Sequence, residues 1–106
     1  EVLLARGAAV DAAKNTGATP LYIAAESGHQ HVAEELLARG AAVDAAENTG
    51  ATPLYIASYN GHQDVAEVLL ARGAAVDAAT SAGATPLLIA AHNGHQDVAE
   101  VLLARG

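Results

Sequence analysis

Histidine recurs at one fixed position in this chain and has the widest chemical range of the side chains present. His29, His62 and His95 each follow a glycine, and they are spaced 33 residues apart. Such a ladder of imidazoles could bind a metal ion or relay protons. His31 adds another imidazole, but at two residues from His29 on a helix start it points in a different direction. No cysteine is present as a further ligand, so we expect structural hydrogen-bonding histidines at the helix starts and no metal site.

The carboxylates and hydroxyls also lack the arrangement that catalysis needs. A carboxylate pair acting as general acid and base requires a partly dry pocket that separates the two pKa values. One aspartate recurs at the same position of each unit: Asp11, Asp44 and Asp77. We expect these aspartates to stabilise turns. Ser27, Ser58 and Ser81 lie at unlike positions without the glycine pattern of a nucleophile elbow, so the sequence predicts no enzyme and no cofactor.

Composition and charge exclude further classes of protein. The chain has 106 residues, enough for one compact unit, and 52% of them are hydrophobic, about half of these being alanine. Without Phe, Trp, Met or Cys it has no disulfide framework, thiolate metal site or cysteine nucleophile. The net charge of −7 argues against nucleic acid and favours a basic or neutral partner protein. No apolar run approaches the roughly 20 residues of a membrane span, so we expect no membrane insertion.

The tripeptide Thr-Pro-Leu recurs with the same period as the histidines, at residues 19–21, 52–54 and 85–87. A period of this length is typical of stacked supersecondary units. In each unit the threonine can cap a helix whose first turn contains the proline, and the glycine before the histidine can end it. A second helix follows, with Val65 and Leu69 on the apolar side of the middle copy. The helix pairs are therefore expected near 20–27 and 30–38, 53–60 and 63–71, and 86–93 and 96–104.

Each unit resembles an ankyrin repeat. The resemblance rests on the run Gly-Ala-Thr-Pro-Leu-Tyr-Ile-Ala-Ala, on Gly-His-Gln and Val-Ala-Glu, and on Leu-Leu-Ala-Arg-Gly-Ala-Ala-Val-Asp, and it covers all 106 residues. It implies an all-α, ankyrin-repeat solenoid of stacked helix-turn-helix units with projecting β-hairpin-like loops. Within this single array it implies a partial repeat (1–13), two full repeats (14–46 and 47–79) and a repeat lacking its final loop (80–106).

One position departs from the ankyrin pattern in every unit. Where the family usually has a structural hydrogen-bonding histidine, this chain has Tyr22, Tyr55 and Leu88. We expect tyrosine to replace part of that bracing, whereas leucine cannot.

Glu35 is a second departure, because the same position is valine in the other units, on the expected apolar side of the second helix. An unpaired carboxylate there would be costly. His31 and Arg39 lie one helical turn before and after it, so we expect the three side chains to form a charged cluster.

The units are nearly identical, so the positions at which they differ are the candidates for a role specific to this chain. By resemblance to ankyrin repeats, the loop tips and the ends of the first helices line a concave face that binds partner proteins. Tyr59 favours recognition over neutral variation, because we expect an exposed aromatic residue flanked by Glu26 and His92 of adjacent units. The expected protein-binding residues are Lys14, Asn15, Thr16, Glu26, Ser27, Glu47, Asn48, Thr49, Tyr59, Asn60, Ser81, His92 and Asn93.

The predicted function is therefore binding of a partner protein through this concave face, without enzymatic activity. The alternative is a structural or spacer segment of a solenoid, or an engineered consensus-like repeat scaffold, with no specific partner. The near-identity of the units favours that alternative.

The two ends of the chain carry further expectations. The chain begins at Glu1 without an initiating Met or an apolar signal segment, so we expect a fragment or a processed piece of a protein in an intracellular (cytoplasmic) location. Apolar side chains near each end, such as Val2, Leu3, Val101 and Leu102, lack one of their expected neighbouring units. We therefore predict head-to-tail stacking of chains through these ends.

Overall fold

The computed structural model describes residues 10–105, and this part of the chain contains α-helices and no strand. The helices are α2 (Pro20–Ser27), α3 (Gln30–Ala38), α4 (Pro53–Asn60), α5 (Gln63–Ala71), α6 (Pro86–His92) and α7 (Gln96–Arg105). Each end lies within about one residue of the predicted range, inside the usual scatter of helix boundaries. The prediction of three helix pairs is confirmed. Val2, Leu3 and Leu4, on which part of the stacking prediction depends, lie outside the described residues.

The first helix of each pair begins and ends where its capping residues require. In α4 the Thr52 hydroxyl accepts a hydrogen bond from the Tyr55 amide at 3.1 Å, and Pro53 occupies the first turn, where a missing N–H costs nothing. Gly61 then ends the helix at a φ of 76°, in the left-handed region that glycine adopts without strain. Such a short helix depends on tertiary packing to persist.

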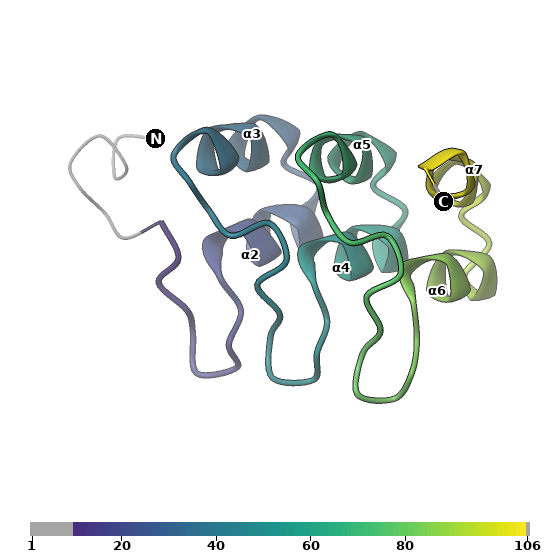
Figure 1. The fold of residues 1–106 in the computed structure, drawn as a ribbon, viewed down its shortest axis with the longest axis horizontal. Coiled ribbons are helices and arrows are strands. Elements are labelled where there is room, and N and C mark those ends of the chain that lie inside the picture. The colour runs from purple at the N-terminus through teal and green to yellow at the C-terminus, as the bar shows by residue number, and fades with distance from the viewer. Residues whose placement is uncertain (1–9, 106) are drawn as a thin grey trace.

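The helices form two layers. Figure 1 shows α3, α5 and α7 side by side in one layer and α2, α4 and α6 in the other, with the connecting loops projecting beyond the first helices. Packing is sequential, because α2 contacts α4, which contacts α6, and α3 contacts α5, which contacts α7. The described residues therefore form the helical stack expected of a solenoid.

Each projecting loop is hairpin-like without being a sheet. In the middle loop the Gly50 amide donates to the Glu47 carbonyl at 2.8 Å, and the Glu47 amide donates to the Ala51 carbonyl at 3.0 Å. The first and last loops repeat this pattern from Lys14 and Thr80. A tight turn and one closing bond thus hold each loop.

The hydrophobic core runs along the stack. Large apolar side chains that are almost completely buried come from each pair of helices: Leu21, Leu54, Val65, Leu69, Val98 and Leu102. Between them, small side chains such as Ala25, Ala57 and Ala90 are fully buried and allow neighbouring helices to approach closely. The scarcity of bulky residues in the sequence is therefore compatible with a dense core.

The expected cluster around Glu35 forms only in part. Arg39 Nε lies 2.9 Å from Glu35 Oε2, so this half of the prediction is confirmed. His31 instead contacts Glu34, with Nδ1 3.3 Å from Oε1, so its predicted pairing with Glu35 is wrong. Residue 34 is three positions after residue 31 and is a neighbour on the helix surface just as residue 35 is.

Substitution of Leu54, whose side chain is 0% exposed, tests whether the core between the stacked helices stabilises the fold. We expect Leu54→Ala to lower the free energy of unfolding by about 2–5 kcal/mol, because it leaves a cavity between stacked helices. The matched control is Leu88→Ala, whose side chain is 57% exposed, with an expected change within about 0.5 kcal/mol. Urea denaturation measures both values, and equal losses would contradict this description of the core.

Candidate protein-binding face

The predicted binding residues lie outside the core. We use "first-helix face" for the exposed sides of α2, α4 and α6 together with the tips of the loops that precede them (Figure 1). Glu47 is half-buried. The other predicted binding residues are exposed: Lys14, Asn15, Thr16, Glu26, Ser27, Asn48, Thr49, Tyr59, Asn60, Ser81, His92 and Asn93.

Two positions of each first helix, four residues apart, form a patch on this face. Residues four apart lie next to each other on a helix surface, and the three helices pack side by side in the order α2, α4, α6. On α4 the rings of Tyr55 and Tyr59 have centroids 6.4 Å apart and planes inclined by 45°, a favourable aromatic geometry. We call the six residues the patch: Tyr22 and Glu26, Tyr55 and Tyr59, and Leu88 and His92.

The patch is electrically negative near α2. Burial raises the pKa of the Tyr22 phenol from 10.0 to about 12, and the charges of Glu47 and Glu26 add to the shift. Glu26 lies one turn after Tyr22 on the same helix, whereas Glu47 belongs to the following loop. The influence of Glu47 on Tyr22 therefore links the loops and the first helices into one electrostatic surface.

The histidines connect neighbouring units. His62 Nε2 lies 3.1 Å from the Glu26 carbonyl, and His95 Nε2 lies 2.9 Å from the Tyr59 carbonyl. The prediction of a structural hydrogen-bonding role is confirmed for both. Their bonds reach the end of the preceding first helix, and neither caps its own helix with its side chain.

The same carbonyls receive a second bond from asparagines predicted to contact a partner. Asn60 Nδ2 donates to the Glu26 carbonyl and Asn93 Nδ2 donates to the Tyr59 carbonyl, each at 3.0 Å. These amide donors are therefore used within the stack. The side chains of Glu26 and Tyr59 are exposed, and within the described residues they make no hydrogen bond.

Neighbouring loops are joined in a similar way. Asn48 Nδ2 donates to the Asn15 carbonyl at 3.1 Å, and the Ser81 hydroxyl donates to the Thr49 carbonyl at 2.8 Å. The Glu47 carboxylate accepts hydrogen bonds from the Thr49 hydroxyl and amide and from the Ala51 amide. Several loop residues that vary between units thus hold the loops in place through hydrogen bonds within and between them.

The aspartates, which were expected to stabilise turns, act between units: Asp11 and Asp44 bond to the loop of the next unit. Asp11 Oδ1 accepts from the Ala42 amide at 3.2 Å, and Asp44 Oδ1 accepts from the Ala75 amide at 3.1 Å. In both cases the donor lies 31 residues further along the chain. Sequence spacing cannot distinguish a local turn from this contact, because both require the same side chain in a loop.

Three members of the patch were not among the predicted binding residues. Tyr22, Tyr55 and Leu88 were expected only to alter bracing of the fold. Within the described residues no hydrogen bond involves either tyrosine hydroxyl, so the expected bracing by tyrosine is wrong. Tyr22 and Tyr55 are half-buried and Leu88 is exposed. Their spacing of four from Glu26, Tyr59 and His92 was the signal that could have identified them.

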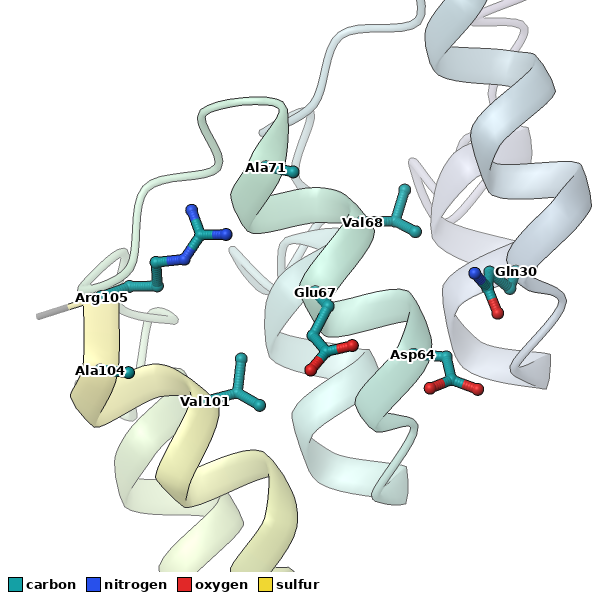
Figure 2. Close-up of a pocket in the computed structure, with 8 residues that line it drawn as sticks. All are labelled: Gln30, Asp64, Glu67, Val68, Ala71, Val101, Ala104 and Arg105. Atoms are coloured by element: carbon teal, nitrogen blue, oxygen red, sulfur yellow. The ribbon is translucent and has the colours of Figure 1, made fainter.

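The exposed sides of α3, α5 and α7, which we call the second-helix face, carry an open groove of about 490 Å³. Figure 2 shows Val68 and Ala71 of α5 on one side and Val101 and Ala104 of α7 on the other, with acidic residues of α5 nearby. Arg105 Nη1 donates to the Leu70 carbonyl of α5 at 3.3 Å and links the two helices. The groove lacks an aromatic residue, and its one arginine is engaged with the Leu70 carbonyl, so it offers fewer binding anchors than the first-helix face.

Residues 10–105 contain no group of three His, Cys, Asp or Glu side chains placed to hold a metal ion. Over the same residues, no helix has the length and apolar character needed to cross a membrane.

Comparison with known proteins identifies one family. The family model described as ankyrin repeats (3 copies) matches residues 1–80 and 44–106, which together span the chain. A search of curated proteins finds no significant match.

Titration of Tyr22 tests the electrostatics of the first-helix face. In a Tyr55→Phe/Tyr59→Phe variant, Tyr22 is the only phenol, and we expect its phenolate absorbance to appear above the ordinary pKa of 10.0, at a somewhat lower pH than the value of about 12 because the charge of Tyr55 no longer contributes. Adding Glu26→Gln should lower this pKa while burial keeps it above 10.0. Because the folded-state pKa of Tyr22 is raised, the fold favours the protonated phenol over the phenolate. The stability that the protonated phenol contributes is complete below pH 10 and is lost as the pH rises toward 12.

Circular dichroism at each pH shows whether the helices persist during the titration. A Tyr22 midpoint at the ordinary value in a helical chain would contradict the described environment.

Proposed function

Because this chain belongs to the ankyrin-repeat family, we propose that it binds a partner protein through the first-helix face. Members of the family are generally protein–protein interaction modules and typically lack catalytic activity. The proposal assigns this general role to one surface of this chain. The repeat boundaries at 14–46, 47–79 and 80–106 and the intracellular location stay predictions.

The observation that carries the proposal is the exposure of Tyr59. Its side chain is 46% exposed, although a tyrosine ring has a large apolar area that water solvates poorly. Tyr55 supports the ring from one side, so part of its orientation is set before a partner binds. A partly ordered aromatic side chain at the centre of a face is typical of a binding anchor.

A structural spacer is the second candidate function, and the similarity of the units favours it. The two candidates differ in what they require of the surface. Partner binding requires particular side chains in the patch, whereas a spacer requires only the stack and tolerates any soluble surface.

A triple variant tests partner binding. We expect Glu26→Ala/Tyr59→Ala/His92→Ala to weaken binding of a natural partner by at least about tenfold, because it removes the central anchor and its neighbours. The partner is captured from cell extract with the full chain, purified, and titrated against both proteins by calorimetry. Backbone carbonyls of Glu26 and Tyr59, which the next unit uses, remain in the variant.

The control is Asp64→Ala/Glu67→Ala/Glu100→Ala, which removes exposed side chains from the second-helix face. Loss of binding in this control alone would move the site to that face. Equal binding by all three proteins would place the site on neither face, and failure to capture any specific partner would favour the spacer.

Head-to-tail self-association also stays part of the proposal. Leu103 is 63% exposed, whereas Leu37 and Leu70, at the same position of the preceding units, are 7% and 6% exposed. Exposed apolar area of this kind favours association. We expect the average mass from light scattering to rise above 10.6 kDa with concentration, and Leu103→Glu to prevent the rise. A constant monomer mass at millimolar concentration would contradict the prediction.

A further inference from the structure

The patch on the first-helix face changes in chemical character from one helix to the next. At the same two positions, α2 presents a tyrosine and a carboxylate, α4 presents two tyrosines, and α6 presents a leucine and a histidine. The helices contact one another in the same order, so the change follows the axis of the stack. A bound segment that crosses the patch would therefore meet different chemistry at its two ends.

The α2 end is suited to a cation. Glu26 is exposed, and within the described residues no basic side chain forms an ion pair with it. Burial would raise the pKa of Glu47, but hydrogen bonds from the Thr49 hydroxyl and from the Ala51 and Thr49 amides outweigh it and hold the pKa below its ordinary value. Glu47 is thus a fixed negative charge near Tyr22. A cation there would face two carboxylates and an aromatic ring, which attracts cations to its face.

The α4 and α6 end is suited to an apolar side chain. Tyr59 and Leu88 are 46% and 57% exposed. They occupy adjacent packed helices, and such exposed apolar area is the part of a surface that gains most from being covered. His92 lies one turn after Leu88 and can serve as a polar edge.

We propose that the first-helix face binds a partner segment in which an arginine or lysine contacts Tyr22, Glu26 and Glu47 while an aliphatic or aromatic side chain covers Tyr59 and Leu88. This inference rests on the proposed function and names the chemistry of the partner. It is supported by the net charge of −7, which attracts basic segments at long range. Lys14 is exposed on the loop before α2 and offsets only part of the negative charge.

The spacing of the helices determines the spacing of these two side chains in the partner. Packed helices lie about 8–10 Å apart, and an extended chain advances about 3.3 Å per residue. A segment with its cation at α2 reaches Tyr59 of α4 after about three residues and Leu88 of α6 after about five or six. The expected motif is therefore a cation and a large apolar residue separated by about three to six positions.

The second-helix face is the main competitor for a basic segment, because it carries Asp64 and Glu67 beside its groove (Figure 2). Its apolar part consists only of valine and alanine side chains, and Arg105 occupies one edge. A partner cation would meet like charge there, and no aromatic ring is available. The first-helix face is thus the better match for a segment with both features.

The experiment selects random twelve-residue peptides displayed on phage against the full chain. Selected peptides are then synthesised with a fluorescent label, and dissociation constants are measured by anisotropy. We expect enrichment of a cation and a large apolar residue at the stated spacing. Tyr59→Ala should weaken binding by at least about tenfold and Glu26→Gln by about two- to fivefold. Raising the salt concentration should also weaken binding.

Glu67→Gln is the matched control, because it removes one exposed carboxylate from the second-helix face. It should leave the dissociation constant unchanged. Selected peptides that lack Lys and Arg, or that are insensitive to Glu26→Gln while Tyr59→Ala abolishes binding, would overturn this inference and leave the proposed function in place. Peptides insensitive to Tyr59→Ala, or a selection without any specific binder, would count against both.

Discussion

The close approach of successive first helices is the constraint on which the rest of the structure depends. Fully buried Ala25, Ala57 and Ala90 leave room for neighbouring helices to pack. Glycine is needed where the units are tightest, since a Cβ on Gly28 would lie 2.7 Å from His62 Nδ1 and one on Gly61 would lie 2.6 Å from His95 Nδ1. Both glycines also have positive φ angles, so a larger residue would meet steric overlap and backbone strain together.

That short separation allows polar contacts to repeat between units. His62 and Asn60 both bond to the Glu26 carbonyl, and His95 and Asn93 bond to the Tyr59 carbonyl. The last carbonyls of a helix have no partner within it, and leaving them unsatisfied beside a packed neighbour would be costly. The next unit supplies the donors, so helix capping and unit stacking are achieved by the same side chains.

The consequence for function is that the backbone and the side chain of a single residue have different roles. Glu26 and Tyr59 contribute their carbonyls to the stack, while their side chains face outward on the first-helix face. Because the backbone positions are held by the next unit, side chains there can differ between units at little cost to the fold. This separation explains how units that are nearly identical elsewhere can carry a carboxylate, a phenol and an imidazole at one position.

Much of the architecture follows from sequence alone, because capping and repetition are local properties. Thr-Pro-Leu, the glycine before each histidine and the period of 33 residues predict the helix boundaries closely. Within-chain comparison likewise selected Tyr59 as an exposed residue. These inferences need only neighbouring residues and the periodicity of a helix.

The pairing of side chains across units was decided only by the tertiary structure. The sequence predicted that Asp11 and Asp44 stabilise turns, but only the structure shows that both bond to amides 31 residues away. The sequence also predicted a contact between His31 and Glu35, although rotamer choice on the helix brings His31 to Glu34. Tyr22, Tyr55 and Leu88 became a surface row only once α2, α4 and α6 were stacked. Sequence determined each helix pair because its signals are local, while contacts between units depend on the relative placement of helices, which no local pattern encodes.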